Sequence, residues 1–131
     1  MATYPNAPDQ PPQRRTSHLR TGRVSLPGCR YFVTAVTQDR KPAFSDSATA
    51  QHLCGTFNQL HAAGDFVLLA ATIMPDHVHL LFELGARLSV GRVCAKFKSL
   101  GRHLGRDSWH WQQDQFEHRL RPNEDLECFG F

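Results

Sequence analysis

The sequence of 131 residues lacks the features that mark secreted, membrane-spanning and zinc-ribbon proteins. It has no apolar run long enough to cross a bilayer, and its start, MATYPNAPDQPPQRR, contains no signal-peptide core. Its four cysteines are widely separated and form no C-x-x-C pair, which favours reduced thiols in a cytoplasmic protein. We therefore expect one soluble domain with a single core, since 40% of the residues are hydrophobic.

Carboxylates are missing from one long stretch of the chain. No Asp or Glu lies between Glu83 and Asp107, whereas six Lys and Arg residues do. A second basic group occupies residues 1–28, a Pro- and Gln-rich segment that we expect to be a mobile arm. A solvated helix face is the simpler explanation for such a charge run. Exposed helices usually mix charges of both signs, however, so the asymmetry favours an anionic polymer as partner.

Periodicity predicts the order strand, helix, strand, strand, helix, strand in residues 29–131. This order is that of a ferredoxin-like sandwich, an α+β fold in which both helices cover one face of an antiparallel sheet. One strand, DFVLLAATIM, lacks alternation, which favours burial on both of its faces. The expected strands cover residues 30–40, 65–74, 77–84 and the end of 109–121, the expected helices cover 45–64 and 88–105, and a further helix opens in 122–131.

The stretch TIMPDHVHLLFE, residues 72–83, places two histidines one residue apart in an apolar strand. Side chains two apart on a strand share a face, so the imidazoles of His77 and His79 can chelate one divalent ion. Glu83 has the same parity but lies about 13 Å further along an extended strand, too far to join them. Hydrogen-bonded core histidines are the alternative, and the spacing alone leaves both interpretations open.

Longer motifs extend the pattern. MPDHVHLLFE resembles the HUH signature (histidine, bulky apolar residue, histidine) of the single-strand tyrosine transposases. The segments GCRYFVTAVTQDRKPAF, VCAKFKSLGRHL and WHWQQDQFEHRLRPNEDL are similar, in this order, to segments of the REP-associated tyrosine transposases. The resemblance covers residues 27–131.

The resemblance implies a ferredoxin-like enzyme that acts on single-stranded DNA, commonly beside a hairpin. His77 and His79 would hold Mg²⁺ or Mn²⁺ with one further polar ligand, and a helix-borne tyrosine would attack the phosphate. Cleavage would leave a 5′-phosphotyrosine, whose reversal would rejoin the strand. The resemblance also allows a homodimer and places the protein at the nucleoid. The cations expected to bind DNA are Arg14, Arg15, Arg92, Lys96, Lys98, Arg102 and Arg106.

The attacking tyrosine of that family has no counterpart among the residues present. It is expected in a helix after the E-D-L segment, with the third metal ligand one turn later, and the sequence ends at Phe131 near that place. Tyr4 lies in the arm, and Tyr31 lies in the first strand, where its ring should pack. We therefore assign the nucleophile to neither tyrosine and expect a C-terminally truncated domain.

Other functions stay open at this point. A catalytically inert module that binds hairpin DNA or RNA uses the same features and needs no tyrosine. A cupin-type metalloenzyme is disfavoured by the two expected helices, and a histidine-triad hydrolase would need a third histidine where Leu81 stands. Trp109 and Trp111 could stack on bases, although we expect one of them to cover the core.

Overall fold

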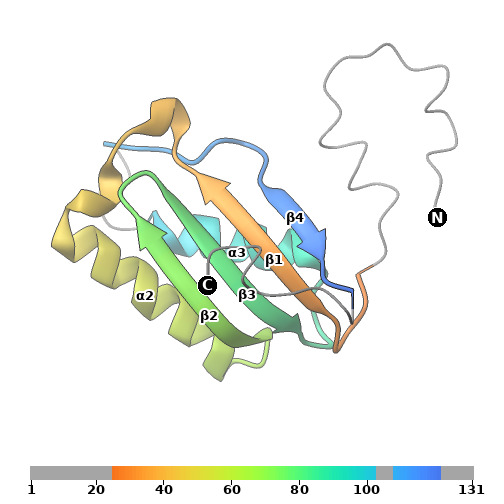
Figure 1. The fold of residues 1–131 in the computed structure, drawn as a ribbon. Coiled ribbons are helices and arrows are strands. Elements are labelled where there is room, and N and C mark those ends of the chain that lie inside the picture. The colour runs from red at the N-terminus through yellow and green to blue at the C-terminus, as the bar shows by residue number, and fades with distance from the viewer. Residues whose placement is uncertain (1–24, 103–107, 122–131) are drawn as a thin grey trace, which may run out of the picture.

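The computed structural model describes residues 25–102 and 108–121 of the chain. Four strands form one antiparallel sheet in the order β2-β3-β1-β4, and two α-helices connect them as in a ferredoxin-like sandwich (Figure 1). The predicted α+β fold is therefore confirmed. The elements are β1 (Arg30–Val36), the short 3₁₀ turns η2 (Gln38–Arg40) and η3 (Ala43–Ser45), α2 (Ser47–Ala62), β2 (Phe66–Met74), β3 (His77–Leu84), α3 (Val90–Gly101) and β4 (Phe116–Arg119).

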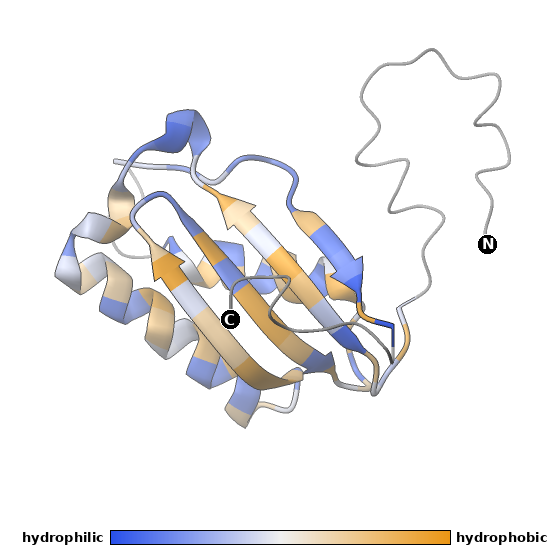
Figure 2. Cartoon of the chain, in the orientation of Figure 1, coloured by the Kyte–Doolittle hydropathy of each residue, from blue (hydrophilic) through white to orange (hydrophobic). Residues whose placement is uncertain are grey.

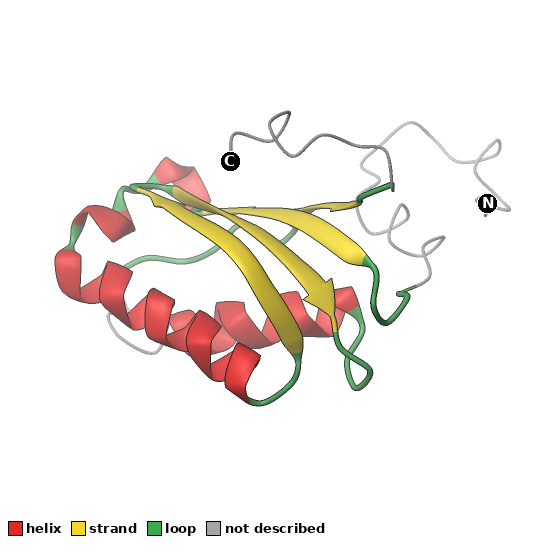
Figure 3. Cartoon of the chain, turned by 60° about the horizontal axis from the view of Figure 1, so that its bottom comes forward, coloured by secondary structure: helices red, strands yellow, loops and turns green. Residues whose placement is uncertain are grey.

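The two helices cover the same face of the sheet (Figure 3). On β3, the side chains of Val78, Leu80 and Phe82 belong to the core between sheet and helices, and each is 0% exposed. Successive residues of a strand point to opposite faces, so His77 and His79 lie on the other side. We call that side, opposite α2 and α3, the histidine face.

Side-chain caps define where the helices begin. Asp46 accepts hydrogen bonds from the backbone N–H and the hydroxyl of Thr49, at 3.0 and 2.7 Å, and these bonds lower the pKa of its carboxyl group. At the start of α3, the Ser89 hydroxyl accepts a hydrogen bond from the backbone N–H of Arg92 at 3.2 Å. After α2, Gly64 adopts φ +81°, a conformation that favours glycine and turns the chain into β2.

Strand β2 corrects one expectation. Its apolar run predicted burial on both faces, but β2 is an edge strand, and Val67 and Leu69 are 46% and 43% exposed. The pairing with β3 is also irregular between Leu68 and Ala70, where a bulge interrupts the register. Apolar residues run along both β2 and β3 (Figure 2), so composition did not distinguish the edge strand from its central neighbour.

Both tryptophans contribute to the core. The rings of Trp109 and Trp111 lie 5.0 Å apart, and each packs against the ring of Phe44. The indole N–H of Trp111 donates to the backbone carbonyl of Lys98 at 3.1 Å. The core role expected for one tryptophan therefore holds for both, and neither ring is presented to a base.

The segment before β1 lies against the domain where the structure describes it. The Ser25 hydroxyl accepts a hydrogen bond from the Val90 N–H, and the Gly28 N–H donates to the Leu84 carbonyl. The rest of the expected arm and the helix expected in 122–131 lie outside the described residues. Within residues 25–102 and 108–121, no helix is long and apolar enough to cross a membrane.

Candidate metal centre

A two-residue connection, Pro75-Asp76, joins β2 to β3 and sets the start of the histidine strand. Neighbouring backbone fixes this connection. The N–H of Thr37 donates to the Asp76 carbonyl and the N–H of Phe44 donates to the Pro75 carbonyl, each at 2.9 Å. The Thr37 hydroxyl adds a bond to the same Asp76 carbonyl at 3.1 Å. The hairpin turn is therefore held by the chain that leaves β1, and His77 follows it directly.

The strand register places both histidines together on the histidine face. In the pairing of β1 with β3, Val36 lies opposite His77 and Thr34 opposite His79. The two imidazole centroids are 4.8 Å apart, with ring planes at 75°. The shared face predicted from their spacing is confirmed. Their role as metal ligands stays a prediction, because the register alone does not test it.

Each imidazole is oriented through its Nδ1 atom. His77 Nδ1 lies 2.7 Å from Asp76 Oδ1, and His79 Nδ1 lies 2.9 Å from the Thr34 hydroxyl. A carboxylate only accepts hydrogen bonds, so the neutral His77 ring carries its proton on Nδ1 and presents a lone pair at Nε2. A partner on one ring nitrogen that aims the other is the usual arrangement around metal-binding histidines. The residues present therefore fit two ligands of a divalent ion.

The electrostatics of this site favour the metal-binding protonation states. Burial, and then the proximity of His77, lowers the pKa of His79, which keeps that imidazole neutral at neutral pH. The hydrogen bond from His77 lowers the pKa of Asp76, and Arg40 adds to this effect. Asp76 is thus a carboxylate that accepts from His77 on one oxygen and from Arg40 Nε, at 2.8 Å, on the other.

Arg40 reaches Asp76 from a strained turn. Asp39 and Arg40 both have positive φ, at 59° and 55°, a conformation that costs about 1–2 kcal/mol for each residue with a side chain. Two such residues in a row persist only when their surroundings hold them, and such strain clusters at functional sites. Sequence reasoning did not identify Thr34, Arg40 or Asp76 as site residues. Only Asp76 carried a local signal, as the residue directly before His77.

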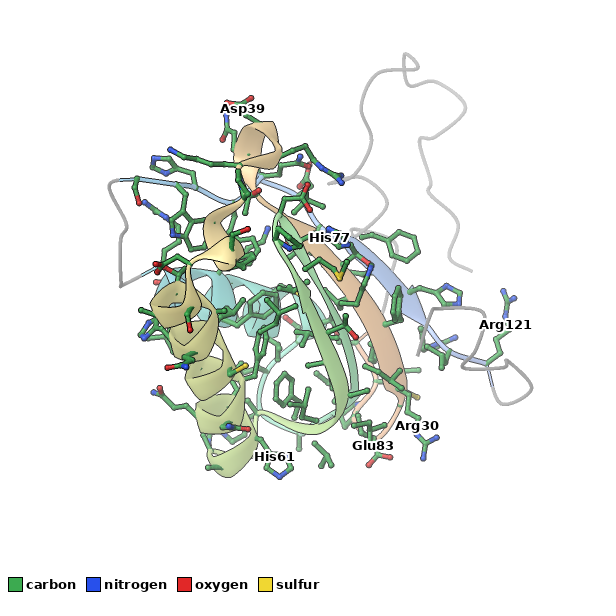
Figure 4. The ribbon with its side chains drawn as sticks, turned by 60° about the vertical axis from the view of Figure 1, so that its left-hand side comes forward. Arg30, Asp39, His61, His77, Glu83 and Arg121 are labelled. Carbon is green, nitrogen blue, oxygen red and sulfur yellow. The ribbon has the colours of Figure 1, made fainter. Side chains whose placement is uncertain are left out.

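The described residues do not complete a metal site from their own acids, histidines and cysteines. No group of three such side chains in residues 25–102 and 108–121 could hold an ion. Glu83 lies at the end of the sheet away from His77 (Figure 4), where its carboxylate is 3.7 Å from Arg30. As the sequence predicted, Glu83 therefore lies too far along the strand to join the two histidines. Further ligands would come from water, a phosphate or residues outside the described ranges.

The side chain of Tyr31 points away from the histidine pair, to the other face of the sheet. Its ring lies on the helix-covered face, is 4% exposed and packs on Phe82, and its hydroxyl accepts a hydrogen bond from the Leu26 N–H at 3.0 Å. This packing is what the sequence predicted for Tyr31. Tyr4 lies outside the described residues.

The predicted DNA-binding cations of α3 belong to the helix layer, on the side of the sheet away from the histidines. Lys96 Nζ donates to Oδ2 of the fully buried Asp65 at 2.6 Å. Lys98 donates to the carbonyls of Gln112 and Gln113, and Arg102 donates to the carbonyl of Trp109. Each of these three side chains therefore ties the helix to another part of the domain.

Arg92 is exposed on α3 and lines a shallow hollow with Lys98 and two glutamines of the following loop, Gln113 and Gln115. Its side chain is accessible to an anion. The remaining predicted cations, Arg14, Arg15 and Arg106, lie outside the described residues. The four predicted cations that the structure describes are thus not gathered around the histidine pair, and the role of the whole set in binding DNA stays a prediction.

The chain thus combines a ferredoxin-like sheet with a histidine pair on the face opposite its helices. Residues 25–119 match the family described as "Transposase IS200 like", and the chain belongs to this family. The family is of the HUH type, whose members are generally metal-dependent. The resemblance seen in the sequence motifs is therefore confirmed.

Individual relatives agree with this assignment. The chain is 29% identical over 122 residues to a Haemophilus influenzae protein assigned by name to the REP-associated tyrosine transposases, covering 76% of this chain and 64% of that protein. It superposes with a TM-score of 0.69 and 19% identity on a REP-associated tyrosine transposase solved with a REP hairpin, covering 82% of this chain and 65% of the other. The chain thus spans just under two thirds of the length of these two proteins.

A second solved structure shares the fold. A Deinococcus radiodurans protein assigned to the transposases superposes with a TM-score of 0.60 and 17% identity, covering 77% of this chain and 85% of that protein. At this level of identity both structural comparisons establish the fold alone.

Proposed function

We propose that this chain is the metal-binding part of a transposase that processes single-stranded DNA beside a hairpin. Membership of the IS200-like family supports the proposal, as does the hairpin in the structure of a related fold. The observation that carries it is the pair of oriented imidazoles: His77 and His79 share one face and have Nδ1 partners that leave Nε2 to a metal. We place the protein in the cytoplasm, at the nucleoid.

In this proposal the chain's own residues assemble and orient the reacting phosphate. Nε2 of His77 and of His79 would hold Mg²⁺ or Mn²⁺, while Asp76 and Thr34 keep the two rings in position. A bound divalent ion polarises the scissile phosphate and offsets the charge that develops on it. Asp76, held by Arg40, keeps the His77 proton on Nδ1 so that the ring does not lose its metal-binding lone pair.

Cleavage and rejoining through a 5′-phosphotyrosine is the activity that the resemblance implies for the complete enzyme. Among the described residues the proposal gives the attacking role to none, because Tyr31 packs on the other face of the sheet. The packing of Tyr31 away from the histidine pair also favours a second candidate function for residues 25–121 taken alone. They would bind a DNA or RNA hairpin without cutting it, as a monomer or a homodimer.

A metal titration tests the proposal. Mn²⁺ should broaden the imidazole NMR signals of His77 and His79 in the wild-type chain, and His77→Ala/His79→Ala should lose the response measured by calorimetry. His110→Ala is the matched control, since His110 is exposed and lies outside the strands. An equal calorimetric response in wild type and the double variant would remove the metal assignment.

A salt titration tests the DNA partner. Binding of a hairpin with single-stranded flanks should weaken as salt rises, with a log–log slope of about −0.7 for each phosphate contact on single strands. Arg92→Ala should reduce the magnitude of that slope by about 0.7. A slope near zero would leave the basic residues as a solvated face and would contradict the nucleic-acid partner.

A further inference from the structure

A row of aromatic rings crosses the histidine face from β3 over β1 to β4. From His77 the ring centroids are 4.8 Å to His79 and 5.4 Å onward to Phe32, which stacks on His79 with planes at 19°. Phe32 meets Phe116 edge-on at 6.3 Å, and Phe116 stacks on His118 at 6.3 Å with planes at 16°. The candidate metal ligands are therefore the first two members of a continuous row of contacting rings.

The rings of this row differ in exposure. Phe32, at its centre, is 5% exposed, whereas Phe116 is 55% exposed, more than any other large hydrophobic residue in the described part of the chain. Leaving a phenylalanine ring in water forgoes much of the stabilisation that its burial would contribute. Phe116 is also on β4, an edge strand of four residues, so its ring is accessible from the face and from the side.

The chemistry around Phe116 selects a flat, π-bearing ligand. Its ring and that of His118 are nearly parallel and belong to residues two apart on one strand, so both present their surface on the histidine face. Bases of single-stranded nucleic acid stack on such side chains whatever their sequence, because every base has a π-face. Aromatic side chains on a four-stranded sheet bind splayed bases in this way in RNA-recognition domains.

We propose that Phe116 and His118 form a base-stacking subsite for single-stranded DNA whose phosphate lies at the histidine pair. This inference rests on the proposed function and adds a positioning role for residues of β4. A strand with its phosphate at His77 and His79 and its base on Phe116 would follow the aromatic row across β1. The stacked base would then fix which phosphate is presented to the metal, without reading the sequence.

A double-mutant cycle between protein and DNA tests the subsite. The probe is a DNA hairpin with a single-stranded flank, together with versions that carry one abasic position in turn along the flank. For the wild-type chain, one abasic position should weaken binding by about 5- to 150-fold, the range that stacking of one base supports. Phe116→Ala should weaken binding of the intact flank by the same factor and cause no further loss on that abasic DNA.

Controls separate stacking from other uses of the ring. Val67→Ala removes an exposed apolar side chain from β2, outside the aromatic row. It should leave the affinities for the intact and for the abasic hairpin unchanged. Phe116→Leu keeps an apolar side chain without a π-face and should behave like Phe116→Ala. Phe116→Trp should restore affinity, and its fluorescence should be quenched by the intact flank but not by the abasic one. Circular dichroism confirms that each variant is folded.

The outcomes distinguish this inference from the proposed function. If neither wild type nor Val67→Ala binds the intact hairpin, the proposed function fails and the subsite fails with it. If both bind but the effects of Phe116→Ala and the abasic position simply add, the stacking subsite alone is wrong. A change in self-association on sedimentation, without coupling to any abasic position, would instead assign Phe116 to contact with a second copy of the chain.

Discussion

The two faces of strand β3 carry opposite tasks within eight residues. Towards the helices, Val78, Leu80 and Phe82 are fully buried among apolar side chains. Towards the other side, His77 and His79 present polar rings whose Nδ1 atoms are held by Asp76 and Thr34. Each buried apolar side chain contributes about 1.5–3 kcal/mol, so the helix-covered face supplies much of the stability that holds the two histidines in place. The residues that position and orient the two imidazoles thus do not themselves take part in the chemistry.

The largest effect should come from breaking the helix-covered face. Phe82→Ala removes a fully buried ring that packs against Tyr31 and Phe66, and should lower the free energy of unfolding by about 3–5 kcal/mol. Urea denaturation measures the loss. The comparison variant is His77→Ala on the same strand, which should cost far less stability while weakening Mn²⁺ binding. Equal destabilisation by the two variants would show that the faces do not divide these tasks.

Lys96 offers a second test within the helix layer. Lys96→Ala leaves the Asp65 carboxylate buried without its 2.6 Å partner, which should lower the free energy of unfolding by about 1–3 kcal/mol. Arg92→Ala, on the exposed side of the same helix, should leave stability nearly unchanged and reduce the salt dependence of DNA binding. If Lys96→Ala instead keeps full stability and lowers the salt slope, its predicted role as a DNA ligand is the correct one.

On the histidine face, Asp76→Asn should act on metal affinity rather than on folding. Loss of the carboxylate weakens the hold on His77 Nδ1 and on Arg40, and such changes beside metal ligands typically reduce affinity about 10- to 100-fold. Glu83→Gln is the matched control, because Glu83 is a carboxylate on the same face at the far end of the sheet. Calorimetry with Mn²⁺ compares the two, and equal affinities would contradict the orienting role of Asp76.

The smallest expected effect concerns Tyr31. Tyr31→Phe removes the hydrogen bond from the Leu26 N–H and should lower the free energy of unfolding by about 1 kcal/mol. Because the ring is on the helix-covered face, the variant should leave any protein–DNA adduct formed with labelled hairpin and Mn²⁺ unchanged on denaturing electrophoresis. If an adduct forms with the wild-type chain and is lost in Tyr31→Phe, then Tyr31 is the nucleophile and the role inferred from its packing is wrong.

Local features were predictable from the sequence, and pairing between distant residues was not. The shared face of His77 and His79 follows from the two-residue period of a strand, and the order of elements follows from their apolar periodicity. The exposure of Val67 depends on β2 being at an edge, which its composition does not encode. The Thr34–His79 contact joins residues 45 positions apart, so it becomes visible only once the register of β1 with β3 is known.

The basic helix shows the same limit. No carboxylate lies between Glu83 and Asp107, but the acid that pairs with Lys96 is Asp65, 31 positions earlier and fully buried. The charges along one segment of sequence give the net charge of that segment. They do not include the charged residues that the fold places beside it. Lys98 and Arg102 likewise have backbone carbonyls as partners, and carbonyls leave no trace in a count of charged residues.

The hydrogen bonds that hold the Pro75-Asp76 turn also constrain how this domain can change length. Thr37 and Phe44 bond to adjacent residues of the turn, so the chain between them has a fixed span. Surface loops usually accept inserted residues and serve as sites for tags or fused domains. Here a deletion between Thr37 and Phe44 would pull on the residue that precedes His77, and an insertion would displace Arg40 from that residue. Length variation across natural homologues should therefore avoid this loop, although it is exposed.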